Sequence, residues 1–124
     1  MLLLKSSAIP FLLKPETVLM IQVVHSVYDK YGKDCTITSM NDGVHSKSSL
    51  HYHGGAADFR IKNILRPGGR EDDPLSWDWT MINKIFRECK AALPLPFQLI
   101  LEKDHIHGEV DWKNFPRQGG MLNG

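Results

Sequence analysis

Residues 48–60 read SSLHYHGGAADFR and place two histidines, two glycines, an aspartate and an arginine within thirteen positions. The end of this stretch continues as AADFRI, residues 56–61, and its side chains alternate between apolar and polar. Such alternation predicts a half-buried strand in which Asp58 and Arg60 point away from the core. The opposite face carries the apolar side chains Ala57, Phe59 and Ile61. The stretch therefore predicts a carboxylate on the exposed face of a strand, next to a histidine-rich turn.

Two amphipathic helices are predicted on either side of this strand in the sequence. In residues 15–31 apolar side chains recur at helical spacing, and Gly32 supplies a stop. In residues 75–93 they step by four and three, starting at Leu75, and Pro94 ends the pattern. We expect the aromatic side chains of this second stripe to lie in the core.

The remaining periodic segments predict strands. Residues 35–40, CTITSM, form a short β-branched run that is typical of a strand. Residues 97–102, FQLILE, are nearly all apolar, which is typical of a central strand. The alternating segment HIHGEV, residues 105–110, follows a tight turn predicted at Lys103 and Asp104. The last two segments together predict a β-hairpin.

These elements predict one α+β domain in which a small antiparallel sheet packs against helices. A chain of 124 residues suits one hydrophobic core. We expect the domain to cover residues 15–112, with an N-terminal segment at 1–14 and a tail at 113–124. Residues 66–74, RPGGREDDP, are charged and rich in proline and glycine, which predicts an exposed loop between elements that borders a cleft.

Composition excludes several classes of function. Fifteen basic and fourteen acidic residues leave a net charge of +1, so no broad electrostatic surface for nucleic acid or anionic membrane is predicted. No apolar run approaches the roughly 18 residues of a membrane span, and Lys5 and Pro10 interrupt the start of the chain in a way that argues against a secretory signal. Cys35 and Cys89 belong to no CxxC pattern and are expected to be buried free thiols. The sequence predicts a soluble protein with one local site and leaves its oligomeric state open.

Histidines and acids in two separate segments have the composition of a zinc site. Alternation in the hairpin's second strand puts His105, His107, Glu109 and Asp111 on one face. Alone, His105 and His107 would be read as hydrogen-bonded surface histidines. Together with His51 and Asp58, however, one of them completes the three ligands that a catalytic zinc ion takes beside a water molecule. The metal lowers the pKa of that water toward about 7.

Two motifs carry a resemblance to a known family. Residues 49–58 fit the pattern S-x-H-x-x-G-x-A-x-D, and HIH follows at residues 105–107. This order resembles the zinc D-alanyl-D-alanine carboxypeptidases and L-alanyl-D-glutamate endopeptidases, which share the Hedgehog/DD-peptidase fold, and is most similar to small phage-encoded peptidoglycan peptidases. The resemblance covers residues 36–111, most of the predicted domain.

The resemblance implies a role for each matching residue. His51, Asp58 and His107 would be the ligands of Zn²⁺. His105 would lie beside the metal and stabilise the oxyanion formed when a peptide carbonyl is attacked. Ser49 would orient substrate or neighbouring groups rather than act as a nucleophile. His53 lies outside the pattern, and we assign it no role.

The general base has two candidates. A hydrolase needs a carboxylate that takes the proton of the water and passes it to the leaving amine. Some relatives place an acid three residues before the last ligand, where Asp104 stands, and others place it farther upstream, where Glu102 stands. If Lys103 and Asp104 form the hairpin turn, Glu102 lies opposite His105 on the metal face, which favours Glu102.

The implied function is zinc-dependent hydrolysis of an amide bond in a peptidoglycan stem peptide. The enzyme would be a phage lysin or virion-associated lytic enzyme, made in the cytoplasm of a bacterial host and acting on the cell wall, or a bacterial housekeeping enzyme.

Many carboxypeptidase members carry an upstream arginine that binds the substrate's terminal carboxylate, and residues 37–49 contain no arginine. Lys47 and Arg60 would replace that upstream arginine only in part, because lysine lacks the bidentate fork of arginine. An endopeptidase is therefore favoured over a carboxypeptidase. Arg60 is retained as a candidate substrate-binding residue. The alternative is a non-catalytic zinc module that binds a cell-wall peptide or a protein partner.

Overall fold

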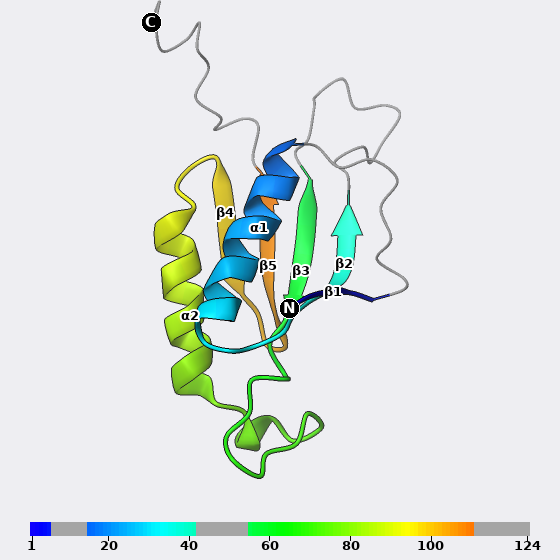
Figure 1. Cartoon of the computed structure of the whole chain (residues 1–124), viewed down its shortest axis with the longest axis vertical. Coiled ribbons are helices and arrows are strands. Elements are labelled where there is room, and N and C mark those ends of the chain that lie inside the picture. Colours follow the sequence, from blue (N-terminus) through cyan, green and yellow to red (C-terminus); the bar gives the residue numbers. More distant parts are fainter. Residues whose placement is uncertain (6–14, 42–54, 111–124) are drawn as a thin grey trace, which may run out of the picture.

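The computed structural model of the chain describes residues 1–5, 15–41 and 55–110, which form a sheet and helices. The elements are, in chain order, β1 (Leu2–Leu4), α1 (Pro15–Lys30), β2 (Cys35–Asn41), β3 (Ala56–Arg60), the 3₁₀ helix η2 (Pro74–Ser76), α2 (Trp79–Ala92), β4 (Phe97–Leu101) and β5 (His105–Val110). The strands lie in the order β1-β2-β3-β5-β4 (Figure 1). The predicted α+β class is confirmed.

The sheet is mixed, whereas the sequence predicted an antiparallel one. All neighbouring strands are antiparallel except β1, which pairs in parallel with β2. The sequence assigned no strand to residues 2–4, because three exposed leucines show neither alternation nor a buried face. Their pairing with the start of β2 is a long-range contact that periodicity does not reveal.

The hairpin of β4 and β5 is confirmed, but the prediction that β4 is a central strand is wrong. β5 pairs with both β3 and β4, so β5 is central and β4 lies at the edge of the sheet. The side chain of Leu99 is buried in β4, whereas Ile100 is 49% exposed. An apolar run therefore marked an edge strand covered on one face by a helix, rather than a strand buried on both faces.

Both helices cover the same face of the sheet (Figure 1). α1 contacts β2, β3 and β5, and α2 packs on β4 and on α1. α1 ends as predicted, with Gly32 in the left-handed region at φ +69°. The hydroxyl group of the buried Tyr28 donates to the carbonyl oxygen of Arg60 at 2.9 Å, which fixes the end of β3 against α1.

The second helix begins later than the sequence predicted. Asp78 is its N-cap and accepts a hydrogen bond from the backbone amide of Met81 at 3.0 Å. Leu75 lies in η2 and is 83% exposed, so its assignment to the apolar stripe of the helix is wrong. The carboxylate of Asp73 accepts from the amide of Leu75 and Pro74 starts η2, so this short turn forms separately from α2.

The two faces of the central strands differ as alternation predicted. In β3 and β5 the side chains toward the helices are buried, namely Ala57, Phe59, Ile106 and Val110. The opposite face carries the partly exposed side chains Asp58, Arg60, His105, His107 and Glu109. A Cβ atom built on Gly108 would lie 2.9 Å from both Met20 Sδ and Leu99 Cδ2, so α1 packs directly on β5 at this glycine. The strands that carry these polar residues are thus packed against the helices on their other face.

The prediction of two buried free thiols is confirmed for Cys35 and Cys89. Burial raises the pKa of each thiol to about 12. Neither of the helices in the described part of the chain has the length and apolar character needed to cross a membrane.

Candidate metal centre

Asp58 and His107 face each other across the two central strands. They are register partners in the antiparallel pair of β3 and β5, and both side chains lie on the face away from the helices. His107 Nδ1 is 2.7 Å from Asp58 Oδ1, at hydrogen-bond distance. The side chains are 27% and 25% exposed, which leaves them partly desolvated but accessible. Strand register thus brings together two residues that are 49 positions apart in the sequence.

His105 extends this pair toward the hairpin turn. It is the register partner of Arg60, and its Nε2 lies 3.6 Å from Asp58 Oδ1 and 2.9 Å from Glu102 Oε1. Its other ring nitrogen, Nδ1, lies 2.6 Å from Asp104 Oδ1. The amide of Glu102 donates to the carbonyl oxygen of His105 at 2.8 Å, so Glu102 faces His105 across the turn, as the sequence predicted.

Glu109 is the last acid in contact with these histidines, and it lies toward the other end of β5. Its Oε1 lies 2.9 Å from His107 Nε2. Acids and imidazoles therefore alternate along the open face in what we term the acid–histidine row. This row consists of Asp58, Glu102, Asp104, His105, His107 and Glu109.

The excess of carboxylates in the acid–histidine row favours the binding of protons or of a cation. It contains four carboxylates and two imidazoles, so repulsion among the acids is relieved by protons or by a cation. Burial lowers the pKa of His107, but its hydrogen bonds to Asp58 and Glu109 and their negative charges outweigh burial and raise the pKa above the ordinary 6.5. The hydrogen bond with His105 lowers the pKa of Asp104 below its ordinary value, which keeps this acid ionised.

The donor atoms suit zinc, which binds imidazole nitrogen and carboxylate oxygen. Two ligand atoms about 2.1 Å from a tetrahedral zinc ion lie about 3.4 Å apart. The pair of Asp58 and His107 is closer than this at 2.7 Å, so side-chain rotations that open the pair by about 0.7 Å would fit the ion. Within residues 1–5, 15–41 and 55–110 no three histidine, cysteine or acidic side chains are grouped so that they could hold a metal ion. The described residues thus include two of the three residues that the sequence predicts as zinc ligands, Asp58 and His107.

Several residues considered in the sequence analysis, including His53, to which no role was assigned, fall outside the described part of the chain. They are Lys47, Ser49, His51, His53 and Asp111. The third zinc ligand expected from the sequence, His51, is among them. Its prediction rests on the motif alone.

Two flanking recesses adjoin the hairpin turn, and both share Lys62 and Asp104. One also includes His105 and Arg60, which is thereby placed beside the acid–histidine row. The other has an aromatic wall formed by Trp77 and Trp79, whose ring centroids are 5.6 Å apart. The sequence assigned neither tryptophan to a site. The position of Lys62 beside the site follows from continuing the alternation of β3, which places Lys62 on the same face as Asp58 and Arg60.

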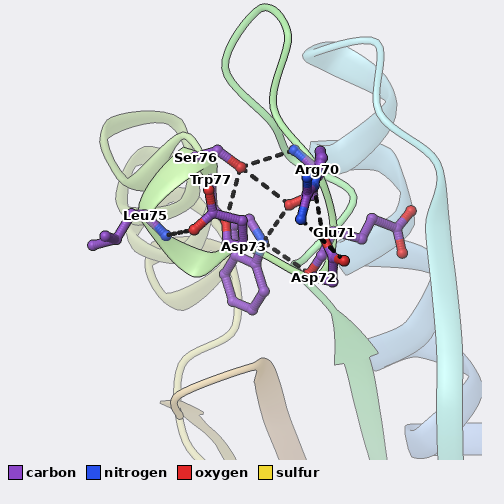
Figure 2. A network of polar contacts seen from close by, with 7 residues as sticks. All are labelled: Arg70, Glu71, Asp72, Asp73, Leu75, Ser76 and Trp77. Atoms are coloured by element: carbon purple, nitrogen blue, oxygen red, sulfur yellow. Dashed lines mark hydrogen bonds and ion pairs between the residues drawn. The ribbon is translucent and has the colours of Figure 1, made fainter.

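The loop that was predicted to border a cleft does line this second recess, through Glu71 and Pro74. Figure 2 shows how its polar groups hold it. The indole N–H of Trp77 is shared by the carbonyl oxygens of Arg70 and Glu71 at 3.2 and 3.1 Å. The hydroxyl of Ser76 donates to the carbonyl of Arg70 and accepts from its amide at 2.8 Å. The loop is therefore exposed but ordered by its own hydrogen bonds.

Comparisons of the chain with models of protein families, with curated proteins and with solved structures found no match.

Proposed function

We propose that the chain is a zinc-dependent peptidase that hydrolyses an amide bond in peptidoglycan stem peptides. The observation that carries the proposal is the contact of Asp58 with His107 across the central strands, beside two further acids in reach of His105. Two of the three proposed ligands are neighbours on an open face, as a metal site requires. The motif at residues 49–58 supplies His51 as the third.

In this proposal His51, Asp58 and His107 hold the zinc ion. A bound zinc ion supplies a Lewis acid that makes water a nucleophile at neutral pH and polarises the scissile carbonyl group. Glu109, in contact with His107 Nε2, would orient that imidazole and keep its ligand nitrogen toward Asp58.

The geometry supports Glu102 over Asp104 as the general base. Glu102 contacts the ring nitrogen of His105 that also faces Asp58, whereas Asp104 contacts the opposite nitrogen. Glu102 therefore lies on the side of His105 that faces the proposed ligand Asp58, and Asp104 lies on the opposite side. A base must be within hydrogen-bond reach of the water from which it takes a proton, directly or through one intermediate group.

His105 and Glu102 are arranged to hold that proton. His105 Nε2 and Glu102 Oε1 lie 2.9 Å apart, so a proton that Glu102 takes from the water would be shared between these two atoms. That proton is then available for the leaving amine. When it resides on Nε2, the same group can stabilise the oxyanion, in accordance with the role implied by the sequence.

Incubation of the purified protein with peptidoglycan sacculi tests the proposal. New amine termini are expected in the presence of zinc and should disappear with a chelator. Zinc-loaded protein that releases no amines would instead be a non-catalytic zinc module. Activity that persists after complete removal of metal would contradict the metal mechanism.

Two sets of variants test the residue roles. His51→Ala should lose the stoichiometric zinc ion, and retention of one zinc per chain would refute the proposed ligand set. Glu102→Gln should lose at least a hundredfold in kcat while it retains metal, because general-base catalysis contributes about 10²–10⁴-fold. Asp104→Asn is the matched control at the same turn. If it loses more activity than Glu102→Gln, the assignment of the base is reversed.

A further inference from the structure

The second recess at the hairpin turn combines an aromatic wall with charged side chains. Its volume is about 560 Å³, within the range of about 300–1,000 Å³ in which small-molecule sites fall. We term it the aromatic recess, and its lining includes Lys62, Glu71, Trp77, Trp79, Lys103 and Asp104. The proposed reaction uses neither tryptophan, so the aromatic wall has no role in it.

Hydrogen bonds hold both indole rings in place and use their N–H groups. The N–H of Trp77 is shared by two carbonyl oxygens of the preceding loop (Figure 2). The N–H of Trp79 donates to the carbonyl oxygen of Pro74 at 2.9 Å. Because Trp77 is only 5% exposed and Trp79 is partly exposed, most of the accessible aromatic surface belongs to Trp79. The wall therefore offers a ligand the carbon surface of a fixed indole ring.

The four charged side chains of the aromatic recess carry no net charge, because Lys62 and Lys103 balance Glu71 and Asp104. The hydrogen bond with His105 lowers the pKa of Asp104 most, and the positive charges of Lys103 and Lys62 lower this pKa further. Asp104 contacts His105 through Oδ1, and a carboxylate has lone pairs for further hydrogen bonds. The recess thus provides both donors and acceptors without an excess of either charge.

This combination favours a neutral ligand that is apolar on one face and polar at its edge. An apolar ligand would remove charged groups from water without giving them partners. An anion or a cation would meet two like charges as well as two opposite ones. A saccharide suits both parts of the recess. The C–H groups on one face of a pyranose ring pack on the negative face of an indole ring, and its hydroxyl groups donate to carboxylates and accept from ammonium groups.

We propose that the aromatic recess binds a neutral saccharide, with a pyranose ring packed on Trp79 and hydroxyl groups bound by Glu71 and Lys103. The inference goes beyond the proposed function, because this binding needs neither zinc nor a reaction. The aromatic recess shares Lys62 and Asp104 with the recess beside His105, so the sugar lies next to the acid–histidine row. In a hydrolase of stem peptides the sugar would belong to the glycan strand that carries them, and peptides on a glycan strand would be preferred over free peptides.

Titration of the full-length protein with chitotriose, a neutral trisaccharide of N-acetylglucosamine, tests the site. NMR should show saturable binding, with saturation transfer from aromatic protons to the sugar C–H protons and upfield shifts of these sugar protons. Trp79→Ala should weaken binding about tenfold or more, whereas Trp79→Phe should retain most of it. Phe86→Ala, which removes an aromatic side chain from the same helix outside the recess, should leave binding unchanged.

A second pair of variants leaves the tryptophans intact, in case Trp79→Ala fails to fold. Glu71→Ala/Lys103→Ala keeps the net charge and truncates two exposed side chains. It should weaken chitotriose binding about tenfold, because hydrogen bonds to charged groups are lost. The matched control is Lys30→Ala/Glu88→Ala, which removes an ion pair between α1 and α2 and should leave binding unchanged.

The absence of saturable chitotriose binding, or unaltered binding in Glu71→Ala/Lys103→Ala, would overturn the proposal. Tighter binding of inorganic phosphate than of chitotriose at the recess would also overturn it, because it would identify an anion site. Chitotriose binding without cleavage of sacculi would contradict the peptidase but support the saccharide site. Zinc-dependent cleavage of sacculi without chitotriose binding would support the peptidase and contradict the saccharide site alone.

Discussion

The buried thiols predict a steep loss of stability at alkaline pH. Cys35 and Cys89 are fully buried between the helices and the sheet, and burial raises the pKa of each to about 12. In the unfolded chain a thiol titrates near its ordinary value of 9.0. The folded pKa is raised, so the contribution of each thiol to stability is complete below pH 9 and is lost progressively between pH 9 and 12.

The size of the effect at pH 10 follows from the unfolded state. At that pH each thiol is about nine-tenths ionised when unfolded but remains protonated when folded, and one pH unit above the unfolded pKa corresponds to about 1.4 kcal/mol per group. The two thiols should therefore lower the free energy of unfolding by about 3 kcal/mol between pH 8 and pH 10. This is a large share of the total stability of a small domain.

Urea unfolding at pH 8, 9 and 10 with a reductant measures this change. The matched control is Cys35→Ala/Cys89→Ala, which is less stable at pH 8 but should lose about 3 kcal/mol less than the original chain on going to pH 10. Equal pH dependence in the two proteins would refute the reasoning. So would rapid reaction of either thiol with a thiol reagent in the folded protein at pH 8, because a buried neutral thiol is not a nucleophile.

Three further perturbations have defined outcomes. In metal-free protein Glu109→Gln should lower the pKa of His107, because the hydrogen bond and negative charge of Glu109 raise that pKa. NMR titration of His107 measures the change, and an unchanged pKa would contradict the contact between His107 and Glu109. Gly108→Ala should lower the free energy of unfolding by about 1–3 kcal/mol, measured in urea, because the added Cβ would lie 2.9 Å from Met20 Sδ. Unchanged stability would show that the Met20 side chain can shift to accommodate the methyl group. Asp78→Ala should lower stability by about 1 kcal/mol through loss of the N-cap of α2, whereas Asp78→Asn should retain most of it.

The local elements were predictable because each one has its own periodicity. Helical spacing located α1 with its stop at Gly32, and period-two alternation located β3 and β5 with the correct faces. The turn at Lys103 also followed from local sequence and placed Glu102 opposite His105. The errors arose where an apolar residue is not in the core. Leu75 fits the helical spacing yet is exposed, because capping by Asp73 starts a separate turn there.

Long-range pairing was not predictable in the same way. The parallel addition of β1 and the edge position of β4 depend on which strands meet, and no residue pattern within either strand encodes its neighbours. The same holds for the recess beside His105, because Lys5 and Arg60 line it together only when β1 pairs with β2.

The sequence by itself thus determined the two helices, strands β2 to β5, the buried faces of β3 and β5, and the chemical types of the proposed metal ligands, because these depend on spacing within short segments. Only the tertiary structure decided that Asp58 and His107 are direct partners, that Glu102 and Asp104 contact opposite nitrogens of His105, and that basic residues gather beside them. The physical reason is that hydrogen bonding across the sheet sets the register between distant strands, and a shift by one residue would turn every one of these side chains to the other face.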